Sequence, residues 1–126
     1  MVVVFFDFEY DTVKKAAEQG ITLGKSECIA FTKAFCSYVE SRGYKAGVYT
    51  NLDYYQNMYD KETLDKYILW LADYTGNPDV KCTYQQYTSS GKVPGINGNV
   101  DMNYFFGEKQ EEEQMGKTAQ DVLNVM

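Results

Sequence analysis

The stretch that decides the fold is Val2-Val3-Val4-Phe5-Phe6, followed at once by Asp7-Phe8-Glu9-Tyr10-Asp11. An unbroken run of β-branched and aromatic residues is typical of a strand buried on both faces, as in parallel sheets. Acidic side chains begin at the point where this run stops. The pattern therefore predicts a buried strand at 2–6 with carboxylates at its carboxyl end.

The next segments extend this strand into an α/β fold. Apolar residues at three- and four-residue steps predict an amphipathic helix from about Gly24 to Arg42, and Gly43 follows it as a left-handed C-terminal cap. A second strand is expected at Ala46–Thr50. Strand, helix and strand form a βαβ unit, which favours a parallel sheet. The expected buried face of the helix consists of Cys28, Phe31, Phe35, Tyr38 and Val39.

The rest of the chain continues in short elements before its character changes. We expect short helices at Leu52–Met58 and Asp60–Tyr67, a strand at Ile68–Ala72, a loosely alternating segment at Cys82–Thr88 and a last strand at Val100–Phe105. Turn-forming residues separate the last two segments. The sequence thus predicts a folded domain over 1–107, with 108–126 as a charged linker or the start of a following helix.

Composition narrows the possible functions. The 126 residues carry 44% hydrophobic side chains, which is enough for the core of one domain. The net charge is −6 and the few basic residues are scattered, so nucleic acid is not an expected partner. The chain has no histidine, which excludes Ser-His or Cys-His nucleophiles and His-ligated metal sites. We expect neither a metal nor a cofactor.

The cysteines and the N-terminal apolar run have structural explanations. Cys28 and Cys36 are eight residues apart in the expected helix, a rise of about 12 Å, which is too far for a disulfide. With Cys82 they make an odd number, so buried thiols are expected. The run at 2–6 is short and has no basic residues before it, so we expect neither a signal peptide nor a membrane span in this chain.

Carboxylates lie where ligands gather in α/β proteins, at the carboxyl ends of the strands. Asp7 and Glu9 are two residues apart, so in extended chain they project to one side with Cβ atoms about 6–7 Å apart. Like charges this close raise the pKa of one member, and a protonated acid beside an ionised base is what glycoside hydrolysis requires. Asp73 follows the third strand, and Asp101 lies early in the last strand. The alternative is a solvated strand terminus.

Aromatic residues fall at or near the same strand ends: Tyr10, Tyr49, Trp70, Tyr74 and Tyr87. Aromatic faces suit sugar rings. Packing in a half-buried position is the other explanation for these side chains.

Four blocks in order carry a resemblance to a known family. They are Val4–Glu9, Gly43–Thr50, Leu69–Tyr74 and Gln86–Ile96, the last followed by Val100–Asn103. Together they resemble family 25 of the glycoside hydrolases, the lysozyme-like N-acetylmuramidases of bacteria and phages. The similarity covers about Val2 to Phe106.

The resemblance implies a role for each candidate residue. Glu9 would be the general acid, Asp7 would stabilise the developing positive charge or orient the 2-acetamido group, and Asp101 would line the same site. Tyr49, Trp70 and Tyr74 would hold the sugars. The implied substrate is bacterial cell-wall peptidoglycan, cleaved between N-acetylmuramic acid and N-acetylglucosamine, outside the cell or at the wall and without a cofactor. Strand spacing leaves both retention and inversion open.

The chain also departs from the family pattern. The family's first strand, with its Gly-Ile/Val-Asp motif, is missing, and Gln85 stands where the family usually has Trp. A complete (β/α) barrel takes roughly 200 residues. We therefore expect a partial (β/α) barrel, mostly parallel and without its N-terminal strands, corresponding to the C-terminal half of the catalytic domain. Its exposed strand edges favour self-association.

Three functions remain open from the sequence. The first is a muramidase, whose isolated activity is uncertain because of the missing strand. The second is a module that binds cell-wall glycan without cutting it. The third is a non-enzymatic, oligomerising α/β domain.

Overall fold

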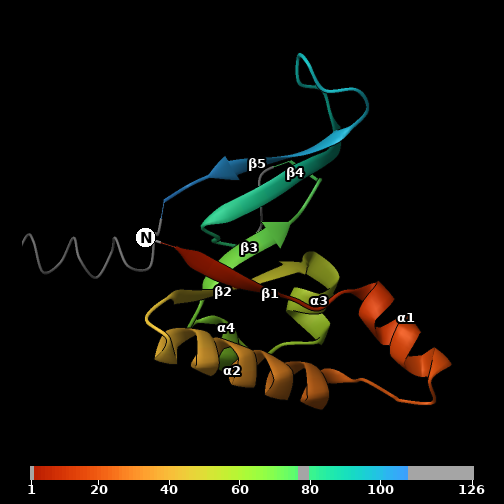
Figure 1. The fold of residues 1–126 in the computed structure, drawn as a ribbon, viewed down its shortest axis with the longest axis vertical. Helices are drawn as coiled ribbons and strands as arrows, with labels where there is room; N and C mark the ends of the chain where they lie inside the picture. The colour runs from red at the N-terminus through yellow and green to blue at the C-terminus, as the bar shows by residue number, and fades with distance from the viewer. Residues whose placement is uncertain (1, 77–79, 108–126) are drawn as a thin grey trace, which may run out of the picture.

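A five-stranded sheet organises the chain in the computed structural model, which describes residues 2–76 and 80–107 (Figure 1). The strands are β1 (Val3–Asp7), β2 (Lys45–Asn51), β3 (Ile68–Ala72), β4 (Tyr84–Gly91) and β5 (Val100–Phe105). They lie side by side in chain order; β1 to β4 are parallel and β5 is antiparallel to β4. The predicted, mostly parallel α/β sheet is confirmed, and over the described residues it does not close into a barrel.

Four helices connect the strands: α1 (Tyr10–Glu18), α2 (Lys25–Ser41), α3 (Leu52–Asn57) and α4 (Lys61–Leu64). The long helix α2 runs along one side of the sheet, whereas α1 extends from the end of β1 (Figure 1). Gly43 has a φ of 87°, the left-handed conformation expected after α2. The helix α1 was not predicted from the sequence, and none of its residues is fully buried; its half-buried Val13 packs against the core.

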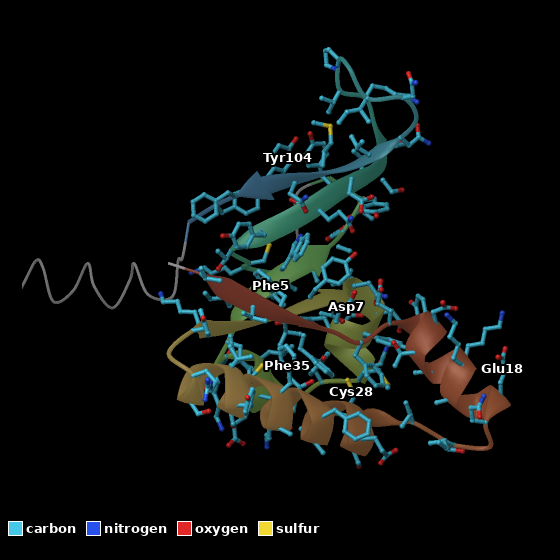
Figure 2. All side chains as sticks on the ribbon, in the orientation of Figure 1. Phe5, Asp7, Glu18, Cys28, Phe35 and Tyr104 are labelled. Carbon is cyan, nitrogen blue, oxygen red and sulfur yellow. The ribbon has the colours of Figure 1, made fainter. Side chains whose placement is uncertain are left out.

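The strand β1 differs from its prediction. Its residues Val3–Phe6 are only half-buried, because β1 is the edge strand of the described sheet and pairs with β2 alone. Val4 and Phe6 pack against the core under α2. Phe5 lies on the opposite face, as Figure 2 shows by comparison with Phe35. There its ring meets Trp70 edge-on, with a centroid distance of 5.2 Å.

The buried face of α2 also differs in part from its prediction. The buried residues are Cys28, Thr32, Cys36 and Val39. The prediction is wrong for Phe31 and Tyr38, which are 46% and 66% exposed. Thr32 takes the core position because its hydroxyl is satisfied: it donates to Cys28 O at 2.7 Å and lies 3.0 Å from the Tyr59 hydroxyl.

The three cysteines are buried thiols outside any disulfide, as predicted. Cys28 and Cys36 lie in the core under α2, and Cys82 packs in a second cluster with Leu69 and Leu71. Among the described helices, none combines the length and apolar character needed to cross a membrane. The linker predicted at 108–126 lies outside the described residues.

Candidate active site

The carboxyl ends of β1, β2 and β3 meet at one edge of the sheet, where a pocket of about 420 Å³ lies. It is lined by Glu9, Tyr10, Tyr49, Asn51, Leu52, Ala72, Asp73, Tyr74 and Thr75. Five of these are residues singled out from the sequence: Glu9, Tyr10, Tyr49, Asp73 and Tyr74. The parallel register that aligns β1 with β2 and β2 with β3 brings them together from distant parts of the chain.

Asp7 and Glu9 occupy the end of β1 and the residue preceding α1. Asp7 pairs in register with Tyr49 of β2, and Figure 2 shows it at the end of β1 beside α1. Glu9 keeps an extended backbone, with φ −124° and ψ 176°, and its N–H donates to Thr12 Oγ1 at 3.2 Å. The two carboxyl groups share a hydrogen bond. The two carboxyls therefore act as an interacting pair of acids.

The pKa values of the two carboxyls are shifted by one shared cause and by others that differ between them. Neighbouring protein atoms remove part of the hydration of each side chain, which raises the pKa of both, although both remain exposed. The negative charge of Asp7 and the shared hydrogen bond raise the pKa of Glu9 further. The same hydrogen bond acts in the opposite direction on the pKa of Asp7. The pair therefore favours a proton on Glu9 and a negative charge on Asp7.

Tyr49 of β2 pairs with Asp7 and contacts residues of β3 and β4. Its hydroxyl donates to Gln86 Oε1 at 2.6 Å, and the Tyr74 hydroxyl donates to the same oxygen at 3.2 Å. Partial burial raises the pKa of Tyr49 to about 12, with further contributions from the charges of Glu9, Tyr74, Asp7 and Asp101. Asp101, although exposed and on β5, is thus within electrostatic range of the same tyrosine.

Trp70 belongs to an aromatic surface beside the pocket. Its ring meets Tyr49 edge-on at a centroid distance of 4.7 Å, and its Nε1–H donates to Asn103 Oδ1 at 2.7 Å. A second hollow of about 430 Å³ lies here, lined by Phe5, Trp70, Tyr84, Asn103, Tyr104 and Phe105. The indole is therefore held from two strands, with uncharged side chains around it.

The two remaining tyrosines differ in position. The Tyr10 hydroxyl donates to Asp53 Oδ2 at 2.7 Å, which raises the pKa of Tyr10 and places the ring at the pocket rim. Tyr87 lies apart from the pocket and stacks on Tyr104 with ring centroids 4.1 Å apart. Tyr104 pairs with Gln85, on the sheet face opposite Gln86.

Two polar residues that contribute to this region, Gln86 and Asn103, were assigned no role from the sequence, and Asp73 was noted only as a carboxylate after the third strand. Gln86 is 4% exposed, and its side chain joins two tyrosines. Gln86 and Asn103 pair across β4 and β5. The sequence signal that could have identified such residues is a polar side chain inside a predicted strand, because a buried polar group requires a hydrogen-bond partner. Among the residues described, no group of three or more His, Cys, Asp or Glu side chains is arranged to hold a metal ion.

Comparisons with known proteins agree on a family. The model of "Glycosyl hydrolases family 25" matches residues 1–96. The autolytic lysozyme of Clostridium acetobutylicum is 31% identical over 97 residues, which cover 73% of this chain and 30% of that protein.

Two solved structures share the fold. The bacterial lysozyme from Streptomyces coelicolor aligns with a TM-score of 0.61 at 20% identity, over 86% of this chain and 52% of that one. The catalytic domain of the endolysin ply40, from bacteriophage P40 of Listeria monocytogenes, aligns with a TM-score of 0.58 at 25% identity, over 82% of this chain and 48% of that one. The chain thus spans about half the length of these two structures and less than a third of the Clostridium lysozyme.

Proposed function

Because this chain belongs to family 25 of the glycosyl hydrolases, we propose that it acts in the hydrolysis of bacterial cell-wall peptidoglycan. The bond cleaved is the glycosidic bond between N-acetylmuramic acid and N-acetylglucosamine. Glu9 is the general acid that protonates the bridging oxygen. Asp7 is the carboxylate that stabilises the positive charge developing at the sugar, or that orients the 2-acetamido group as an internal nucleophile.

The hydrogen-bonded pair of Asp7 and Glu9 carries this proposal. A general acid must hold its proton near the working pH, and the charge of Asp7 raises the pKa of Glu9 in that direction. The ionised neighbour is then available to stabilise positive charge on the sugar. Both groups stand at the carboxyl end of a parallel strand beside an open pocket, where a polymer chain has access.

The remaining candidates position the glycan. Tyr10, Tyr49 and Tyr74 present ring faces and hydroxyls around the pocket, and Trp70 extends the aromatic surface. Asp101 adds a third carboxylate within electrostatic range of Tyr49. Tyr87 supports this surface from the opposite face of the sheet through its stack on Tyr104. The region 1–107 is the part of the catalytic domain that holds these groups, and its place of action is the cell wall.

The test is the clearing of a bacterial cell-wall suspension by the purified chain and by its Glu9→Gln variant. Glutamine keeps the shape of the side chain but has no acidic proton, so the initial rate should fall by at least about a hundredfold. Glu18→Gln, at the exposed end of α1, is the matched control and should leave the rate unchanged. Full activity of Glu9→Gln would overturn the assignment.

A second candidate function is glycan binding without cleavage. The observation that favours it is the open sheet: over the described residues, the strands do not close into a barrel around the carboxylates. Binding of wall glycan without clearing by the unaltered chain would favour this module over the enzyme. Clearing by the isolated chain would exclude it.

A further inference from the structure

Asp73 is a buried carboxylate in the wall of the pocket. It directly follows β3 and is only 4% exposed. Its backbone N–H donates to Gln86 O at 3.1 Å, and its carbonyl accepts a 2.7 Å hydrogen bond from Gln85 Nε2. The segment that carries this carboxylate is therefore fixed from β4 at two points.

The two oxygens of the Asp73 carboxylate have different surroundings. Oδ1 accepts hydrogen bonds from the backbone N–H and the hydroxyl of Thr75. Oδ2 is buried and has no hydrogen-bond partner among the described residues. A buried acceptor without a donor is unfavourable, so a donor brought by a ligand would recover a hydrogen bond that the folded chain lacks.

The charges around Asp73 indicate which donor fits. The nine lining residues of the pocket include two acidic residues, Asp73 and Glu9, and no lysine or arginine. Asp7, beside Glu9, adds a further negative charge. A neutral hydroxyl would satisfy the acceptor but not the charge, whereas an ammonium group provides the donor and the opposite charge together.

We propose that the pocket at the ends of β1, β2 and β3 binds a primary ammonium group on Asp73, and that its source is an N-deacetylated hexosamine of the cell-wall glycan. This inference rests on the proposed function and names the substrate class that the site prefers. Asp73 itself lines this pocket, and the next two side chains, Tyr74 and Thr75, are exposed members of the same wall.

The glycan of peptidoglycan is a better source of this ammonium group than its peptide part. Tyr10, Tyr49 and Tyr74 surround the pocket, and aromatic faces with hydroxyls at their edges suit a flat, hydroxyl-bearing sugar ring. A sugar whose amine pairs with Asp73 also lies next to Glu9, which lines the same pocket. A free amine on a flexible peptide would pair with the Asp73 carboxylate but would not stack on the tyrosine rings.

The experiment is calorimetric titration of the unaltered chain with two probes, N-acetylglucosamine tetramer and its fully deacetylated counterpart, at a pH where the amine is protonated. The deacetylated tetramer should bind about tenfold more tightly, as expected for a hydrogen bond between charged groups. Nα-acetyl-lysine methylamide, the third probe, presents the same ammonium without a sugar and should bind far more weakly.

Variants assign the preference to Asp73. Asp73→Asn should bind the two tetramers with equal affinity. Asp65→Asn, which removes an exposed carboxylate paired with Lys61, makes the same change in net charge and should keep the preference. The preference should also decrease as salt is added.

The outcomes separate this inference from the function on which it rests. Binding of the acetylated tetramer without a preference for the deacetylated one would overturn the inference and leave the proposed function standing. Binding of the lysine derivative as tightly as the deacetylated tetramer would overturn the sugar as the source. Failure to bind either tetramer would contradict both proposals.

Discussion

The hydroxyl of Tyr49 donates a 2.6 Å hydrogen bond to Oε1 of Gln86, which ties the end of β2 to β4 across the intervening β3. Gln86 Oε1 accepts a second, longer hydrogen bond from Tyr74. One buried amide oxygen thus fixes two aromatic side chains of the pocket. The pocket wall depends on this shared acceptor as much as on the strands themselves.

Tyr49→Phe tests this relationship. The variant keeps the ring and its contact with Trp70 but removes the donor, so the free energy of unfolding should fall by about 1 kcal/mol. Urea denaturation measures the loss. Tyr38→Phe, which removes a hydroxyl from a side chain that is 66% exposed, is the control and should have no effect. Equal stabilities of the two variants would show that the shared acceptor does not stabilise the wall.

Asp7→Asn tests the coupling between the carboxyls. The charge of Asp7 raises the pKa of Glu9, so its removal should lower that pKa, as a titration of the Glu9 carboxyl carbon by NMR would show. A raised pKa means that the folded protein binds the proton more tightly than the unfolded chain does. Stability therefore falls as pH rises through the pKa of Glu9.

Asp7→Asn should also change how the stability of the fold depends on pH. Asp7→Asn should stabilise the fold only above the pKa of Glu9, by about 0.3 kcal/mol, since solvent screens exposed charges. At acid pH, where Glu9 is protonated, the gain should disappear. Asp65→Asn removes an exposed carboxylate far from Glu9 and should leave the pKa of Glu9 unchanged. An unchanged pKa in Asp7→Asn would contradict the coupling.

The strands could be predicted where local pattern and tertiary environment agree. Ile68–Ala72 and Val100–Phe105 match β3 and β5 to the residue because apolar or alternating runs there are bounded by polar and turn-forming residues. The helix α2 was predictable from its period, but its orientation was not. Thr32 is buried in place of Phe31 with help from a hydrogen bond to the Tyr59 hydroxyl, which is 27 residues away.

The site could be predicted only in part for the same reason. Asp7 and Glu9 are local in sequence, and a two-residue step along an extended chain brings their carboxyls together. Gln86 acts through tyrosines that are 37 and 12 residues away, so nothing adjacent to it in sequence reveals its partners. Asp73 precedes Tyr74 in one of the recognised blocks, but its unpaired oxygen depends on packing that only the structure shows.

Gly47→Ala tests the packing of the sheet face that carries Phe5. A Cβ at this position would lie 2.4 Å from the Phe5 ring and 2.9 Å from the Ile68 carbonyl oxygen. The variant should lose about 2 kcal/mol of stability. Adding Phe5→Leu removes part of the clash, so the double variant should lose less than the sum of the two single variants. Additive losses, measured by urea denaturation, would contradict this contact.

Phe105→Lys tests self-association through the edge strands of the described sheet. Phe105 is 64% exposed on β5, the last strand of the described sheet, and its ring lies 5.0 Å from that of Tyr84. We expect the unaltered chain to form dimers as its concentration rises in sedimentation velocity experiments. A lysine at an edge opposes strand pairing, so the variant should remain monomeric. A monomer at every concentration of the unaltered chain would contradict the prediction.

Gln85→Leu tests how the Asp73 segment is held. Gln85 is 1% exposed, and its Nε2 donates to the carbonyls of Asp73 and Gly76 at 2.7 and 2.8 Å. Leucine fills a similar volume but leaves both carbonyls without these donors, which should cost about 2 kcal/mol of stability. Because the segment after β3 is then less constrained, the amide of Asp73 should exchange with deuterium faster than in the unaltered chain.

The control for this variant is Gln56→Leu, at an exposed position of α3, which should change neither stability nor exchange. The position of Gln85 also predicts a functional effect that is separate from stability. The Asp73 carboxylate belongs to the segment that Gln85 fixes, so Gln85→Leu should weaken glycan binding under conditions where the variant remains folded. Binding as tight as that of the unaltered chain, together with faster exchange, would show that the pocket tolerates motion of this segment.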